Sequence, residues 1–517
     1  MNELPNDNAG LQALVLEQRE MLQRQQNTIA NLQGELNDKL AEIEQLKSQL
    51  AILKRQQFGR CSEKVKRTIQ QVEKRLNELQ EECIQLLAPA EPGVPVALRQ
   101  SPARKPLPTE LPREEQRLSP EESACPECGG DLKPLGEEVS EQLELIQSAF
   151  KVIRWVREKQ ACSRCDCIVS AAVPSRPIDR GVAGPGLLAR VIMSKYGEHT
   201  PLYRQSEIYA RQGVELSRST LGRWVGAVSE LLQPLVSEIQ RTVLQAPKLH
   251  VDDTPVKVQE AGSGKTRTAR LWAHVRDERN AGSKQPPAVW FNYTPDRKGI
   301  HPQTHLKHYQ GILQADAYSG FDKLYQADTI QEAACMAHAR RKIYDAHIRH
   351  PSPNSQEALE QISQLYKIEA KVRGQSAEQR LKVRRKESLP LLEALEDWLR
   401  EKVRTLSPHG ELAKAFNYLL NHWQALSLFC SNSLVEIDNN IAENALRAVA
   451  LGRKNYLSMG SDRGGGFAAN LYTLIGTCKL NGMEPEAYLR HVLSVIADHP
   501  INRIQELLPW NIKLTAT

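Results

Sequence analysis

The sequence lacks any apolar run that approaches the roughly 20 residues a membrane-spanning helix requires, which excludes a helical membrane protein. Its first residues also lack a charged segment followed by an apolar one, so no signal peptide is expected and cytoplasmic residence is the default. A strong excess of one charge is missing too. The formal net charge is +6 over 517 residues, so an argument for nucleic-acid binding has to come from local basic clusters.

The composition, with 40% hydrophobic and 25% charged residues, is that of ordinary globular proteins. At about 100–200 residues per domain, the length predicts roughly three or four domains. We therefore expect a modular chain with several separate cores.

Two pairs of cysteines, Cys125/Cys128 and Cys162/Cys165, have the spacing of a zinc knuckle and are separated by 33 residues. An alternating, strand-like run over residues 150–157 lies between them, so the pairs could meet at one end of a small sheet. This predicts a zinc-ribbon-like module over residues 121–175. Cys167 is a rival for the fourth ligand position, and a set of unmetallated buried thiols is the alternative interpretation.

Residues 11–53 keep one heptad register over six heptads, which predicts a coiled coil and hence a homo-oligomer. The alternative is a single helix folded back on its own chain. A basic segment over residues 55–67 follows, and a second helical stretch runs to about Leu87; the basic run either contacts DNA or is a solvated face. Residues 88–120 are rich in proline and predict a linker.

Three helical segments are expected within a helix-turn-helix-like region, residues 183–243. They span residues 187–196, 201–211 and 217 to about 236. Gly213 lies in the turn before the last helix, and Ser217 is a suitable N-cap for it. Arg218 and Arg223, near the start of that helix, could reach bases or phosphates. A plain helical hairpin is the competing interpretation.

The hydrophobic pattern changes to that of strands after residue 247. Strands are expected over residues 249–258, 269–275, 288–293 and 311–315, with a helix over residues 302–309. This order matches the start of an RNase H-like sheet. We therefore predict a multidomain α/β protein with an RNase H-like core over residues 247–345 and 432–482, an all-helical insertion over residues 346–431 and a C-terminal tail over residues 483–517.

Three acidic segments offer one carboxylate each to a common point. Asp252 lies on the first predicted strand, Asp316 follows the fourth, and Glu443 lies in a helical pattern, with 126 residues between Asp316 and Glu443. Carboxylates from separate elements can hold two Mg²⁺ or Mn²⁺ ions about 3.5–4 Å apart, an arrangement suited to phosphodiester chemistry. Asp253, Asp322 and Asp438 are competing carboxylates, and for any single segment a turn-capping role is the alternative.

Basic residues downstream of Glu443 form a candidate clamp for DNA ends. They are Arg447, Arg453, Lys454 and Arg463, the last three beside glycine-rich backbone that can approach a strand closely. His338, with Arg340 and Arg341, either faces the same site or is paired elsewhere. The basic run over residues 379–386 in the insertion either touches DNA or is a solvated helical face.

Several motifs together resemble the transposases of the insertion sequence 66 type, the large DDE proteins of those bacterial elements. They are His250-Val-Asp-Asp-Thr-Pro255, Leu313-Gln-Ala-Asp-Ala-Tyr318, Ala337-His-Ala-Arg-Arg-Lys342, Asp438-Asn-Asn-Ile-Ala-Glu443, Gly452-Arg-Lys-Asn455 and Gly460-Ser-Asp-Arg-Gly464. The resemblance implies that Asp252, Asp316 and Glu443 are the metal-binding triad and that small accessory proteins of the same element assist.

The sequence departs from the family pattern at three positions: Cys61 replaces the usual serine, Asp253 the usual glutamate and Asn444 the usual arginine. None of these removes a triad residue, but the DNA contact of that arginine does not carry over to position 444.

The function expected on these grounds is DNA transposition. The protein would bind terminal inverted repeats, cut the 3′ strand at each element end with water, and join the freed 3′-hydroxyl to target DNA. The alternatives are an RNase H-like metal-dependent nuclease without strand transfer and a catalytically inactive DNA-binding relic.

Overall fold

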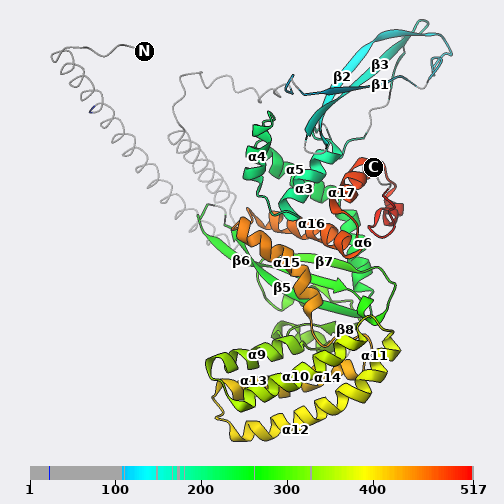
Figure 1. The fold of residues 1–517 in the computed structure, drawn as a ribbon. Helices are drawn as coiled ribbons and strands as arrows, with labels where there is room; N and C mark the ends of the chain where they lie inside the picture. Colours follow the sequence, from blue (N-terminus) through cyan, green and yellow to red (C-terminus); the bar gives the residue numbers. More distant parts are fainter. Residues whose placement is uncertain are drawn as a thin grey trace, which may run out of the picture. The chain divides into compact units, whose positions relative to one another are not determined.

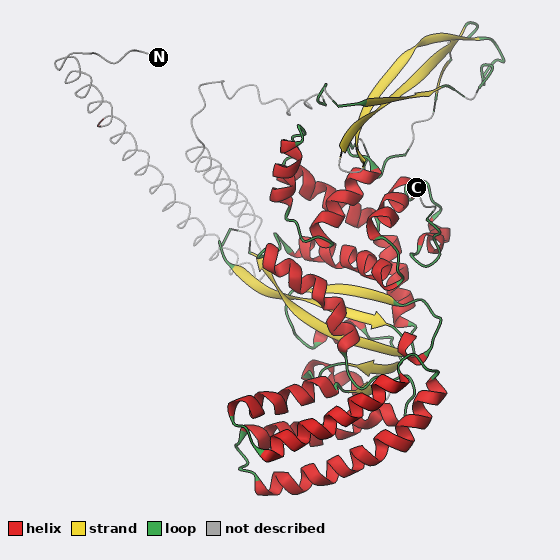
Figure 2. Ribbon diagram, in the orientation of Figure 1, coloured by secondary structure: helices red, strands yellow, loops and turns green. Residues whose placement is uncertain are grey.

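The computed structural model describes Gln23 and residues 107–109, 111–120, 122–146, 149–165, 167–171, 175–179, 181–260, 262–326 and 329–514. The chain divides into two units, residues 1–104 and 105–517, and everything that follows concerns the second. Apart from Gln23, the predicted coiled coil and basic segment within residues 1–87 and the linker up to residue 106 lie outside the described residues. The second unit is mixed α/β, with two sheets and many helices (Figure 2).

The first sheet consists of a long hairpin with two short strands beside it. Its strands are β1 (Arg113–Leu118), β2 (Leu132–Ile146), β3 (Ala149–Cys162) and β4 (Ile168–Ser170). β2 and β3 pair antiparallel, and β1 pairs parallel with β3. The predicted linker therefore ends before β1, so its extension to residue 120 was wrong. Prediction missed β1 because its sequence has no apolar alternation; exposed ion pairs such as Arg117 with Glu137 flank the backbone ladder instead.

The helices that follow are α3 (Pro185–Tyr196), α4 (Leu202–Arg211), α5 (Arg218–Leu231) and α6 (Gln233–Leu244). They confirm the three expected helices, except that the third ends at Leu231 and not near Val236. Pro234 lies in the first turn of α6, where its missing N–H removes no helical bond, and it marks the break.

The hairpin of the first sheet contacts the start of α3 through Glu144. Its carboxylate accepts hydrogen bonds from the backbone N–H groups of Gly186 and Leu187, at 3.2 and 2.7 Å. A Cβ atom on Gly184 or Gly186 would lie within 2.5 Å of this carboxylate. The glycines on both sides of Pro185 therefore allow the sheet and the helix to approach each other.

The second sheet has five strands in the order β7-β6-β5-β8-β9 (Figure 1). They are β5 (Lys248–Gln259), β6 (Thr266–Arg276), β7 (Ala288–Thr294), β8 (Gly311–Gln314) and β9 (Ile330–Ala333), with α7 (Ile300–His305) before β8. β5, β6 and β7 pair antiparallel, whereas β8 pairs parallel with β5 and with β9. The four predicted strands are confirmed. β9 was missed, because four residues directly before a helical pattern carry too little period-2 signal.

Helices from the C-terminal part cover this sheet. α15 (Asn440–Asn455) packs on β5 and β6, and α16 (Asp462–Leu480) packs on β7 (Figure 1). On β7, the backbone N–H groups of Val289 and Phe291 donate to the hydroxyls of Thr477 and Thr473, so the edge strand is covered rather than open. The expected C-terminal tail contains α17 (Pro485–Val495), which packs on α3. No helix in the described ranges has the length and apolar character needed to cross a membrane.

A second hydrophobic cluster joins the helical insertion to β8 and β9, through Ile312 and Ala333. The insertion contains α10 (Pro353–Val372), α11 (Ala377–Val383), a π-helical turn (Arg384–Ser388), α12 (Leu389–Thr405), α13 (Glu411–Asn421) and α14 (Trp423–Ser427). α9 (Met336–Arg349) leads from β9 into the insertion and spans its expected start at residue 346.

Two residues of the basic run in this insertion turned out to be structural. The side chains of Arg380 and Arg384 are 1% and 0% exposed. Arg384 forms a bidentate pair with Glu369 at 2.6–2.7 Å, and Arg380 pairs with Glu436 at 2.8 Å. The basic run was expected either to contact DNA or to form a solvated face. Both interpretations are wrong for these two arginines, because they are buried in ion pairs.

The chain re-enters the sheet through two buried amide side chains. Gln314, at the end of β8, donates to the carbonyl of Glu436 at 2.5 Å and accepts from its N–H at 3.1 Å. Asn439, which is fully buried, donates to the carbonyl of Val251 at 2.8 Å, and its side-chain oxygen lies 2.9 Å from Nδ1 of His250. These bonds hold the start of α15 against β5.

We expect Asn439→Ala to lower the free energy of unfolding by about 1–3 kcal/mol, because it leaves the buried carbonyl of Val251 and the ring of His250 without partners. Urea denaturation measures this as a lower midpoint. The neighbouring Asn440 is exposed and bonds only to Asp438 among the residues described, so Asn440→Ala is the matched control and should change stability by less than about 0.5 kcal/mol. Equal midpoints for the two variants would show that the amide does not anchor α15.

Candidate active site

The three candidate carboxylates come from three elements that meet at one edge of the second sheet. Asp252 is on β5, Asp316 follows the end of β8 by two residues, and Glu443 is in the first turn of α15. β5 and β8 run parallel with His250 opposite Gln314, so each strand reaches its aspartate two residues further on. All three residues line one cavity of about 760 Å³.

The three carboxylates lie close enough for the charges of Asp316 and Glu443 to affect the pKa of Asp252. Burial, together with the negative charges of Asp316, Asp253 and Glu443, raises the pKa of Asp252 to about 7, although the hydrogen bond from the backbone N–H of Asp253 lowers it. Oε1 of Glu443 is buried and has no hydrogen-bond partner among the residues described. Both observations fit a site for a hard divalent cation, which would neutralise this charge and accept these oxygen ligands.

Asp253 is already neutralised by protein cations, which distinguishes it from Asp252. Its side chain is only 2% exposed and lies 2.9 Å from both Arg270 and Arg297. Arg297 also approaches Asp316, at 3.5 Å. Of the other competing carboxylates, Asp322 and Asp438 do not line this cavity. The geometry therefore supports Asp252 over its neighbour as the free ligand.

His338 lines the same cavity. This agrees with the first of its two interpretations, that it faces the carboxylate site, and not with pairing elsewhere. Its Nδ1 lies 3.7 Å from Oε1 of Glu443, and neither atom has a hydrogen-bond partner in the described part of the chain. Together with Sγ of Cys335, these atoms form a group within 4.8 Å that could hold a metal ion, whereas the carboxylates of Asp252 and Asp316 lie outside that group. Burial raises the pKa of the Cys335 thiol to about 11, which makes His338 and Glu443 the better donors of the three.

Of the four basic residues predicted to form a clamp for DNA ends, two line the carboxylate cavity and two lie outside it. Arg447 and Arg453 line the cavity, and Arg453 donates to the carbonyl of Pro255 at 2.6 Å. Lys454 is exposed but does not line the cavity. Arg463 also lies outside it, paired with Glu230 on α5. The cavity thus brings together two of the four predicted residues.

The two arginines expected in the helix-turn-helix region are both exposed on α5. Arg218 is its first residue and Arg223 lies a little over one turn further on. Ser217 caps the helix by accepting a hydrogen bond from the N–H of Thr220, as predicted. Because Leu221 and Trp224 are buried on the inner face, the arginines are available to a ligand on the outer one.

The four cysteines expected to bind zinc come together at one end of the long hairpin. Sγ of Cys128 lies 3.3 Å from that of Cys165 and 3.4 Å from that of Cys162, and Cys125 lies 3.3 Å from Cys165. All four ligand atoms lie within 4.8 Å of one another, which fits a tetrathiolate zinc site. Cys167 is not in this group, which favours Cys165 as the fourth ligand.

Comparison with protein families agrees with this arrangement. A family model described as "Transposase IS66 family" matches residues 180–466, more than half of the chain. The chain belongs to the IS66 transposase family. Further models match the "zinc-finger binding domain of transposase IS66" over residues 122–166, the "IS66 C-terminal element" over residues 473–510 and the "Transposase C of IS166 homeodomain" over residues 45–115.

Similar proteins occur in Sinorhizobium fredii. The uncharacterized protein y4hP is 40% identical over 89% of this chain and 87% of its own length. Another, y4qI, is 34% identical over 99% of this chain and 98% of its own length. The IS66-type architecture is therefore shared over nearly the whole length of these relatives.

Sequence reasoning missed three residues that shape the site. Asn439 is part of the Asp438-Asn-Asn motif, but its role as an anchor was not recognised; a polar residue four positions before Glu443, directly before a helix, was the available signal. Cys335 has no second cysteine near it in the sequence that would mark it as a metal-ligand candidate. Arg297 lies in a loop after β7 and carries no local pattern that connects it with Asp253 and Asp316.

We expect the purified chain to contain one zinc ion held by the tetrad and Cys165→Ser to lose it, because the serine hydroxyl does not replace a thiolate ligand. Elemental analysis after gel filtration gives the zinc content. Cys167→Ser is the matched control and should keep the ion. Loss of zinc in the Cys167 variant with retention in the Cys165 variant would reverse the assignment.

The raised pKa of Asp252 predicts a pH-dependent stability when no divalent cation is added. Below about pH 4 this carboxyl is protonated in both states; between about pH 4 and 7 only the unfolded chain releases the proton, so the free energy of unfolding falls across this window. Asp252→Asn should remove this fall, which is on the order of a few kcal/mol. The urea midpoint of Asp252→Asn minus that of wild type should therefore increase from pH 4.5 to pH 8. The same difference for Asp322→Asn, which changes an exposed carboxylate, should not change over this range.

Proposed function

We propose that the protein is the DNA transposase of a bacterial insertion sequence with an RNase H-like catalytic core. The strand order β7-β6-β5-β8-β9, with three antiparallel strands followed by two parallel ones, supports this fold assignment. The single observation that carries the proposal is the meeting of Asp252, Asp316 and Glu443 in one cavity, although 126 residues separate the last two. Family membership supports the same activity.

The proposed division of the chain follows the expected boundaries. Residues 247–345 and 432–482 form the core, residues 346–431 the insertion, residues 121–175 the zinc module and residues 183–243 the DNA-binding helices. The zinc module and the exposed Arg218 and Arg223 would bind terminal inverted repeats. Homo-oligomerisation through residues 1–87 and help from small accessory proteins belong to the same proposal.

The proposed site would hold two Mg²⁺ or Mn²⁺ ions through Asp252, Asp316 and Glu443. Such ions activate an attacking oxygen and stabilise a leaving one when they are bound. Arg447 and Arg453 would orient the scissile phosphate, since both line the cavity and their guanidinium groups match phosphate oxygens. Arg297 would keep Asp253 neutralised and Asp316 directed towards the cavity.

The reaction has two steps at one site. A water oxygen attacks the phosphorus atom at the 3′ end of the element, and the 3′-oxygen of the element leaves with a proton. That 3′-hydroxyl then attacks a phosphodiester of target DNA in line, and the target's 3′-oxygen leaves. No covalent enzyme intermediate is needed. In each step the attacking oxygen forms a bond to phosphorus while the bond from phosphorus to the leaving 3′-oxygen breaks.

We expect protein incubated with Mg²⁺ and labelled element ends to give strand-transfer products, and Asp316→Ala or Glu443→Ala to lose them by about a thousandfold or more. Removing one ligand forfeits several kcal/mol of metal-assisted stabilisation. Asp322→Ala, an exposed acid outside the cavity, is the matched control and should retain activity. Cleavage without joining would identify a nuclease, and binding without cleavage in wild type would identify a DNA-binding relic or a missing accessory protein.

A further inference from the structure

A second hollow lies beside the carboxylate cavity, where α9 faces α10 of the insertion and the start of α15. Its volume is about 380 Å³, and it is lined by Ala337, Arg340, Arg341, Tyr344, Tyr366 and Asn440. Arg341 and Asn440 also line the carboxylate cavity. The two spaces are therefore neighbours that share a wall.

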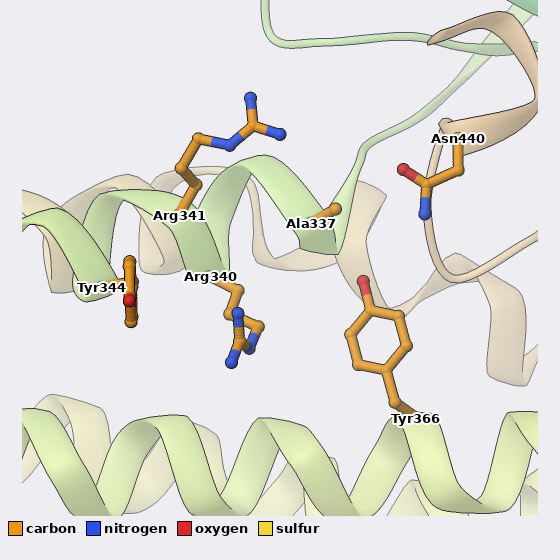
Figure 3. Close-up of a pocket in the computed structure, with 6 residues that line it drawn as sticks. All are labelled: Ala337, Arg340, Arg341, Tyr344, Tyr366 and Asn440. Atoms are coloured by element: carbon orange, nitrogen blue, oxygen red, sulfur yellow. The ribbon is translucent and has the colours of Figure 1, made fainter. Parts of the chain in front are cut away.

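The side chains that line this hollow include aromatic rings and arginines, the groups on which a flat ring such as a nucleobase can stack. Tyr344 on α9 and Tyr366 on α10 supply aromatic rings, and the guanidinium of Arg340 lies 5.9 Å from the centre of the Tyr344 ring. Figure 3 shows Arg340 and Tyr344 extending from α9 towards α10. Tyr344 is 45% exposed, so its ring is accessible to a ligand, and Arg340 makes no ion pair with any residue that the structure describes.

Arg341 connects the hollow to the proposed catalytic site. It extends from the other side of α9 in Figure 3, and its guanidinium lies 3.9 Å from the carboxylate of Glu443. A DNA strand with its scissile phosphate at the carboxylates would pass this arginine, and the next nucleotide would lie at the mouth of the hollow. Aromatic rings and arginine planes bind such bases by stacking, with little dependence on sequence.

We propose that the hollow between α9 and α10 accepts one unstacked nucleobase of the DNA end, adjacent to the phosphate bound at Asp252, Asp316 and Glu443. The volume is within the roughly 300–1,000 Å³ of small-ligand pockets and leaves room for one base. Extracting the base draws the strand into the carboxylate cavity and sets which phosphate lies there. This inference rests on the proposed function, because it names the nucleotide that accompanies the reacting phosphate.

The test places 5-iododeoxyuridine at successive positions around the cleavage site of the element end and irradiates the complex without Mg²⁺. We expect one position to cross-link to Tyr344 or Tyr366, identified by mass spectrometry. With Mg²⁺, Tyr344→Ala should cleave the unmodified end about 5- to 150-fold more slowly, which corresponds to about 1–3 kcal/mol of stacking. Tyr344→Phe, which keeps the ring, should cleave like wild type.

Two controls separate a base-binding role from a merely structural one. Ile348→Ala alters another exposed side chain of α9, outside the hollow, and should leave cleavage unchanged. An abasic nucleotide at the cross-linking position removes the need to unstack a base, so it should restore cleavage by Tyr344→Ala towards the wild-type rate.

The outcomes distinguish this inference from the proposed function. If wild type cleaves but cross-links only to residues outside the hollow, or if Tyr344→Ala behaves like Ile348→Ala, the base-binding hollow is wrong and the transposase proposal stands. If wild type neither cleaves nor joins DNA, the proposed function fails first, and this inference fails with it.

Discussion

The site depends on one buried amide. Asn439 joins the carbonyl of Val251 and the ring of His250 on β5 to the start of α15, and its own N–H donates to Sγ of Cys335 at the start of α9. Through these bonds a segment that returns after a whole helical insertion reaches the sheet in one position. This anchor acts with the bonds of Gln314 to Glu436 and with the packing of α15 on β5 and β6, and together they fix the position of Glu443 relative to Asp252.

The second constraint is the repulsion among the acids that this anchor brings together. Burial and the charges of Asp316, Asp253 and Glu443 together raise the pKa of Asp252 to about 7, which favours a cation in the cavity. Arg270 and Arg297 pair with Asp253, whereas Asp252 forms no ion pair with any residue that the structure describes. The buried pair of Arg380 with Glu436 joins the insertion to the segment that leads into Asn439, and Arg384 donates to the carbonyl of Val435 in the same segment.

Much of this could be predicted from the sequence, and the reasons for success and failure are physical. β5 to β8 follow from period-2 apolar patterns, the start of α5 from a serine cap and a glycine turn, and the cysteine tetrad from its spacing. β1 and β9 could not be predicted, because their stability comes from pairing with distant strands rather than from their own residues. The burial of Arg380 and Arg384 could not be predicted either. A basic run indicates an exposed surface unless acidic partners are known, and here the fold brings Glu369 and Glu436 to these arginines. Arg297 is close to Asp316 only because β7 and β8 belong to one sheet.

A crystal structure of the protein soaked with Mn²⁺, with the ions located by their anomalous scattering, tests the central claim most directly. The account predicts manganese in contact with the carboxylates of Asp252, Asp316 and Glu443, with Asn439 still bonded to β5. Manganese held only by Cys335, His338 and Glu443, without contact to Asp252 or Asp316, would contradict it. In that case the shared cavity would contain a different metal site, and the three acids would not act as one unit.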